Sequence, residues 1–93
     1  MDKKMIEKKL REFLFLKNKY NENQFKPMRY KIKDSYQDIV KEIYPYLEDE
    51  IEIDGFIIKK AYHNLPDRII NYLQVYTKES FKRSQNFLKK QNG

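Results

Sequence analysis

Of all the segments in this sequence, the alternating acidic residues in the middle of the chain come nearest to a known metal-binding motif, the calcium-binding loop. Glu50, Glu52 and Asp54 alternate and are followed by Gly55, as in the first half of a calcium-binding loop. Such a loop also needs a bidentate carboxylate at its twelfth position, and here that position is Ala61. We therefore expect an ordinary β-hairpin with acidic edges in this segment, and no calcium site.

Catalytic and metal-binding patterns are equally incomplete elsewhere in the sequence. His63 is the only histidine, there is no cysteine, and no serine forms a recognisable triad with His63. The neighbouring acids from Glu48 to Asp54 would point to opposite faces of a strand, whereas a metal nuclease needs carboxylates that converge on a cleft. Both glycines are isolated, so a glycine-rich phosphate loop is excluded. We predict a protein that is not an enzyme, binds no metal or other cofactor, and uses His63 to cap or pack the last helix.

The run from residue 25 to residue 33 interleaves basic residues with aromatic and apolar ones. Lysine and arginine neutralise phosphates and aromatic rings stack on bases, so this pattern favours nucleic-acid binding. The alternative is a solvated loop whose aromatic rings turn into the core. We predict phosphate contacts from Lys26, Arg29, Lys31 and Lys33. Phe25 and Tyr30 are predicted to stack on bases or to line a contact with another protein.

A second set of basic residues falls on the last predicted helix, whose polar face would carry Arg68, Lys78, Lys82 and Arg83. We include these four residues in the predicted nucleic-acid footprint, with an ordinary solvated helix face as the alternative. The chain also has eight tyrosines, a residue type that is enriched at protein interfaces. Glu50 and Glu52 lie on the acidic hairpin edge, a patch that would imitate a phosphate backbone toward a basic partner, and they are predicted as protein-interface residues.

The charged residues are sorted into blocks. Residues 1–33 carry eleven Lys or Arg and four Asp or Glu, residues 34–54 carry one and eight, and residues 55–93 carry eight and two. The formal net charge of +6 permits attraction to nucleic acid. The acidic block either pairs with the basic segments or forms a separate acidic face, and the sequence leaves both arrangements open.

Helical periodicity is clearest in two segments. Residues 2–21 have apolar residues three, four and seven positions apart, which predicts a helix with one apolar face formed by Ile6, Leu10, Phe13, Leu14 and Tyr20. Pro27 interrupts the pattern, so residues 22–33 are predicted as a basic loop. A second helix is predicted over residues 34–47, with its start at Asp34 or Ser35 and its end or bend near Tyr44, before Pro45.

The remainder of the chain predicts a hairpin and a long helix. The pair Asp54-Gly55 lies between two β-prone runs, which is the strongest short hairpin signal and predicts a hairpin over residues 51–60. Asn64 is a suitable helix cap and Pro66 suits a first helical turn, so a helix is predicted over residues 65–90. The predicted fold is one domain over residues 1–93, mainly α with one small β-hairpin, in the order α-α-β-β-α with a long C-terminal helix.

These features predict a function carried out by binding. Our first hypothesis is a small regulatory protein associated with nucleic acid, or with a basic or nucleoprotein partner, through its basic segments. The alternative is a protein-binding inhibitor or adaptor of a larger machine, encoded by a phage or mobile element. The long last helix would support a homodimer. The longest apolar run near the N-terminus, residues 13–16, is too short for a signal segment or membrane span, so we expect a cytoplasmic protein without a membrane partner.

Overall fold

Two antiparallel helices form the first half of the structure. The structure is a computed structural model that describes residues 1–92 and the side chains of residues 1–86. Helix α1 spans Lys3–Glu22 and helix α2 spans Lys26–Ile43. Asp2 caps α1 by accepting a hydrogen bond from the Met5 N–H at 2.8 Å. The helix predicted over residues 2–21 is therefore confirmed, with a shift of one residue at each end.

The loop predicted over residues 22–33 is wrong, because most of that segment is the start of α2. Pro27 lies in the first turn of α2, where a missing N–H costs no helical hydrogen bond. The actual connection is residues 23–25, where the Asn23 side chain accepts a hydrogen bond from the Phe25 N–H at 2.9 Å. Ser35, expected at a helix start, lies inside α2 and donates its hydroxyl to the Lys31 C=O.

The end predicted for the second helix agrees better with the structure than its start. Helix α2 stops at Ile43, and Tyr44–Tyr46 form a single 3₁₀ turn, η1, that contains Pro45. Tyr44 keeps helical backbone angles and its N–H still donates to the Val40 C=O. Pro45 has no N–H to donate to the Lys41 C=O, which explains why the α-helical hydrogen bonds stop at this point.

Three antiparallel strands follow, in the spatial order β1-β2-β3. Strand β1 spans Glu50–Ile53, β2 spans Phe56–Leu65 and β3 spans Arg68–Thr77. The predicted turn at Asp54-Gly55 is confirmed, since both residues have positive φ, 50° and 84°, as a type I′ turn requires. Strand β2 continues beyond the predicted hairpin, and pairs with β3 from Phe56 opposite Thr77 to Leu65 opposite Arg68.

The helix predicted over residues 65–90 is wrong in its first half, which is strand β3. Pro66 and Asp67 form the turn between β2 and β3, a role for which proline is as well suited as it is for a helix start. The order of elements is therefore α-α-β-β-β-α, and the predicted fold class, mainly α with one hairpin, is incorrect. A three-stranded sheet accompanies the helices.

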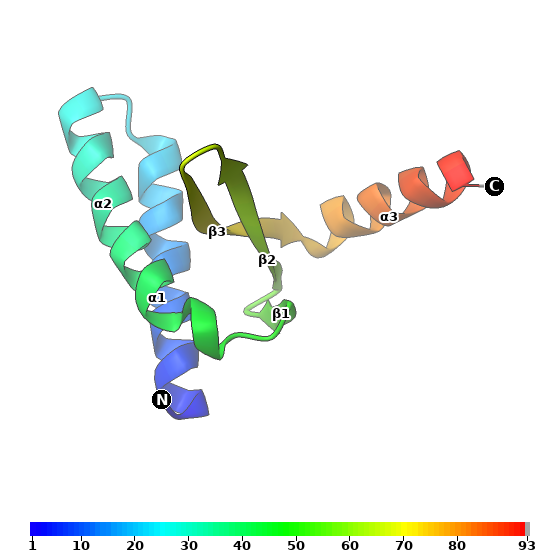
Figure 1. The fold of residues 1–93 in the computed structure, drawn as a ribbon, viewed down its shortest axis with the longest axis horizontal. Helices are drawn as coiled ribbons and strands as arrows, with labels where there is room; N and C mark the ends of the chain where they lie inside the picture. The colour runs from blue at the N-terminus through cyan, green and yellow to red at the C-terminus, as the bar shows by residue number, and fades with distance from the viewer. Residues whose placement is uncertain (93) are drawn as a thin grey trace.

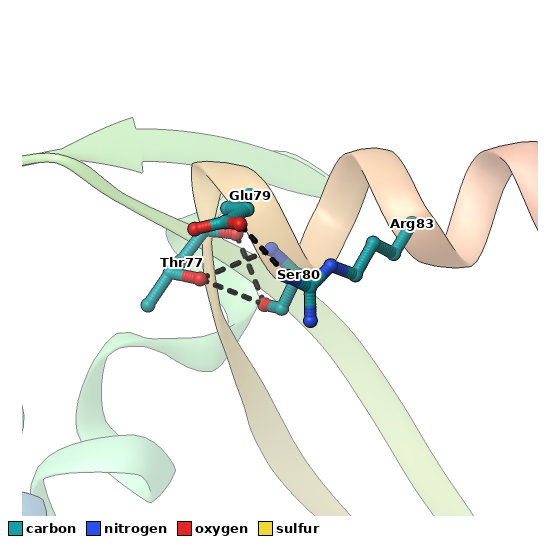
Figure 2. A network of polar contacts seen from close by, with 4 residues as sticks. All are labelled: Thr77, Glu79, Ser80 and Arg83. Atoms are coloured by element: carbon teal, nitrogen blue, oxygen red, sulfur yellow. Dashed lines mark hydrogen bonds and ion pairs between the residues drawn. The ribbon is translucent and has the colours of Figure 1, made fainter.

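Helix α3 spans Lys78–Asn92 and extends away from the rest of the molecule (Figure 1). Its start is fixed by Thr77, whose hydroxyl accepts a hydrogen bond from the Ser80 N–H at 3.1 Å (Figure 2). The Ser80 hydroxyl lies 3.0 Å from the Thr77 hydroxyl and 3.1 Å from the Thr77 C=O. Arg83 pairs with Glu79 one turn apart. Among the described residues, no helix combines the length and the apolar content needed to cross a membrane.

The core lies between the helical hairpin and the sheet. Phe13 is 1% exposed and meets the ring of Tyr36 edge to face at 5.7 Å. The buried apolar residues come from α1, α2, all three strands and the segment after η1: Leu10, Phe13, Tyr36, Ile39, Val40, Ile43, Leu47, Ile53, Ile58 and Leu73. The sheet thus rests on α1 and α2, and the tip of the β2–β3 ribbon lies beside these helices (Figure 1).

Replacing Gly55 with alanine is expected to destabilise the fold by about 1 kcal/mol, because a Cβ atom is strained at a φ of +84°. Nothing lies within 4 Å of the added Cβ, so the loss would come from backbone strain alone. Urea denaturation measures the change. Gly55→Asn is the matched control, because asparagine tolerates positive φ better and should lose less. Equal losses for the two variants would contradict this account.

Candidate nucleic-acid interface

Ion pairs show where the acidic block lies. Arg11 pairs with Asp54 at 3.0 Å, Lys9 with Glu42 at 3.2 Å, and Lys78 with Glu52 at 2.7 Å. Three of the eight acidic residues in this block thus contact α1 or the start of α3. Within residues 1–86 none of the eight forms an ion pair with a residue of the 26–33 segment. Exposed pairs such as these contribute only about 0–1 kcal/mol each. Their main effect is to neutralise some basic residues and leave others uncompensated.

Four of the uncompensated basic residues line two adjoining hollows between α2 and β3, which we call the basic groove. The first hollow, about 320 Å³, is lined by Lys17, Lys33 and residues of β2 and β3. The second, about 550 Å³, is lined by Lys41 and Arg68. Gln37, Ile70 and Asn71 line both hollows, so the two lie side by side. Among the described residues, no carboxylate lines either one.

Helix α2 supplies one wall of the basic groove through a regular spacing. Arg29, Lys33, Gln37 and Lys41 are each four residues apart, so they lie along one side of the helix. Lys33 and Lys41 are separated by about 12 Å along the axis. At the N-terminal end of this row, Arg29 lines a small hollow of about 190 Å³ together with Tyr20, Lys26 and Tyr30.

Aromatic rings hold two of these cations in place. The Lys17 Nζ lies 4.9 Å from the centre of the Tyr36 ring, and the Arg29 Cζ lies 4.3 Å from that of Tyr20. Hydrogen bonding to the Arg29 side chain lowers the pKa of Tyr20, and the charges of Arg29, Lys33 and Lys17 act in the same direction. Burial raises the pKa of Tyr36. The lowered pKa of Tyr20 reflects the positive potential at this end of the helical hairpin.

A flat aromatic pair borders the basic groove on the sheet side. The rings of His63 and Tyr72 stack with their centres 4.5 Å apart and their planes at 14°. Both residues line the hollow that also contains Lys17 and Lys33. His63 lies in β2, so its predicted role as a cap of the last helix is wrong.

The structure brings together only part of the predicted nucleic-acid footprint. Lys26, Arg29, Lys33 and Arg68 line the basic groove or the small hollow at its end. Lys31 is exposed and lines neither, Lys78 and Arg83 are in ion pairs, and Lys82 is exposed on α3.

The predicted protein-interface residues are separated in space. Phe25 and Tyr30 are 66% and 64% exposed at the helical hairpin's loop end. Glu50 and Glu52 line a different hollow of about 540 Å³, which also contains Glu7 and Glu48. The molecule therefore carries a basic groove and a separate acidic hollow.

Sequence reasoning missed most of the polar and aromatic residues that line the groove: Lys17, Gln37, Lys41, Asn71, Tyr72 and, as a groove residue, His63. The spacing of four from Arg29 to Lys41 was a detectable signal, but reading residues 22–33 as a loop concealed it. Lys17 belongs to α1 and joins the others only through tertiary packing. Neither protein-family models nor curated proteins match the sequence, and no solved structure matches the fold.

Proposed function

We propose that this protein acts by binding nucleic acid, with the basic groove as the contact surface and phosphates as the main ligands. The observation that carries the proposal is the set of four cations, Lys17, Lys33, Lys41 and Arg68, around hollows that no described carboxylate lines. Within residues 1–86, none of the four forms an ion pair. Such a surface is complementary to a polyanion.

The charge distribution along α2 gives this proposal further support. A helix N-terminus is the positive end of the macrodipole and favours acidic residues, yet the first turn of α2 contains none and begins with Lys26. Arg29 adds a second cation nearby. This arrangement disfavours the helix slightly but concentrates positive potential beside the groove, which is favourable if an anion binds there.

Salt dependence is the direct test of the proposed function. If Lys17, Arg29, Lys33, Lys41 and Arg68 each contact one phosphate, affinity for a single-stranded oligonucleotide should fall about 100-fold between 50 and 200 mM salt. Fluorescence anisotropy with labelled DNA and RNA oligonucleotides, single-stranded and duplex, measures this change. Failure to bind any of these probes at 50 mM salt would contradict the proposal, as would an affinity independent of salt.

A further inference from the structure

The basic groove has cationic ends and an uncharged middle, where the apolar Ile70 lies with two amide side chains. Gln37 and Asn71 line both hollows, with Lys17 and Lys33 in one of them and Lys41 and Arg68 in the other. Phosphate oxygens only accept hydrogen bonds from protein donors, whereas the amides of Gln37 and Asn71 both donate and accept. Base edges also offer both donors and acceptors. The middle of the groove is therefore better matched to bases than to phosphates.

The stacked pair His63 and Tyr72 adds a second feature suited to bases. These rings lie in the same hollow as Lys17 and Lys33. The His63 side chain is exposed and Tyr72 is half-buried, so a flat ligand has access to the pair. Aromatic faces next to cations are the combination with which proteins hold single strands, because every base has a π-face and every nucleotide a phosphate.

Strand β3 contributes backbone groups along the same groove. It lies at the edge of the sheet, and among the described residues no further strand pairs with its outer side. Alternate residues of an edge strand direct their N–H and C=O groups away from the sheet. Residues 68–73 of β3 line the two hollows without interruption. The outer edge of β3 thus offers further donors and acceptors next to the groove, of the kind that base edges use.

The volumes of the two hollows also indicate what size of ligand fits them. Volumes of about 320 and 550 Å³ are typical of sites that enclose a small molecule, and they suit individual nucleotides. In a duplex the faces of the bases are stacked and their pairing edges are occupied, so a base could neither enter a hollow nor stack on the His63–Tyr72 rings unless it left the helix. On this basis we infer that the groove is specific for single-stranded nucleic acid, with unpaired bases at Gln37, Asn71 and the His63–Tyr72 stack. This inference rests on the proposed function.

The test compares a labelled 12-nucleotide single strand with a duplex of the same sequence at 100 mM salt. The wild-type protein should bind the single strand at least 10-fold more tightly. The double variant Gln37→Ala/His63→Ala should lose about 10-fold in affinity for the single strand, because one stacking ring and one amide are removed. Its affinity for the duplex should change less than 2-fold. Its salt dependence should also be unchanged, because neither substitution removes a lysine or arginine.

Two controls accompany this comparison. Gln85→Ala, at an exposed position on α3, should bind like the wild type. Gln37→Ala alone changes only an exposed position on α2, so it should fold like the wild type. If the double variant has a lowered melting temperature, the single variant shows whether weaker binding comes from a lost base contact or from impaired folding. Equal affinity for single strand and duplex would overturn this inference and leave the proposed function standing. Equal weakening of both by the double variant would overturn the base contacts, and no binding of either probe would overturn the proposed function itself.

Discussion

Removing three cations from the basic groove is expected to weaken nucleic-acid binding about 100-fold at 100 mM salt. The variant is Lys33→Ala/Lys41→Ala/Arg68→Ala, which deletes charges on both walls of the groove. Each phosphate that a cation no longer neutralises keeps its condensed counterion when the protein binds, and three such phosphates account for a change of this size. The slope of log affinity against log salt for a single strand should fall by about 2. Anisotropy titrations at several salt concentrations measure both quantities.

A matched variant distinguishes the groove from net charge. Lys4→Ala/Lys8→Ala/Lys82→Ala also removes three positive charges, from exposed positions that line neither hollow. Lys4 and Lys8 lie in the N-terminal half of α1, and Lys82 lies on α3, which extends away from the body (Figure 1). Screening over about 10 Å limits their influence, so we expect a decrease in affinity of only a few-fold. If both variants weakened binding equally, binding would depend on total charge and the groove would have no special role.

The parts of the fold that the sequence predicts correctly are those set by local patterns. The apolar spacing over residues 2–21 matches α1 because one face of that helix packs on the core through Leu10 and Phe13. The Asp54-Gly55 turn was predictable because few residue pairs tolerate positive φ twice in succession. In both cases the deciding interactions lie within a few residues of one another.

Strand β3 was missed because its local signals fit two structures. Leu65, Ile69, Leu73 and Tyr76 have helical spacing, yet the segment is also rich in β-branched and aromatic residues, which favour strands. What decides in favour of the strand is pairing with β2 over ten residues, together with burial of Leu73 against the helices. These contacts are tertiary, and the hydrophobic period of a single segment contains no information about them.

The candidate site was predictable only in part for the same reason. Arg29 and Lys33 were identified because they lie in a conspicuous basic run, but Lys31 from the same run lies outside the groove once the segment is helical. Lys17 and Arg68 join the site from α1 and β3. The composition indicates a basic surface. Which cations meet in the groove is determined by the spacing of four residues from Arg29 to Lys41 on α2 and by the packing of the sheet against the helices.

The largest effect on stability is expected from Phe13→Ala, which should reduce the free energy of unfolding by about 3–5 kcal/mol. Phe13 is 1% exposed and packs edge to face on Tyr36, so truncation removes apolar packing and leaves a cavity between α1 and α2. A protein of this length has about 5–14 kcal/mol of total stability, so the variant would lose a large share of it. Urea denaturation followed by circular dichroism measures the loss.

Phe25→Ala is the matched control, because the same atoms are removed from a ring that is 66% exposed at the helical hairpin's loop. Its stability should stay within about 0.5 kcal/mol of the wild type. Similar losses for the two variants would contradict the placement of the core.

The comparison also bears on binding, because Phe13 lines the hollow that contains Lys17 and Lys33. If Phe13 holds the helices at the spacing that forms this hollow, Phe13→Ala should weaken nucleic-acid binding even at temperatures where it remains folded, whereas Phe25→Ala should preserve the groove.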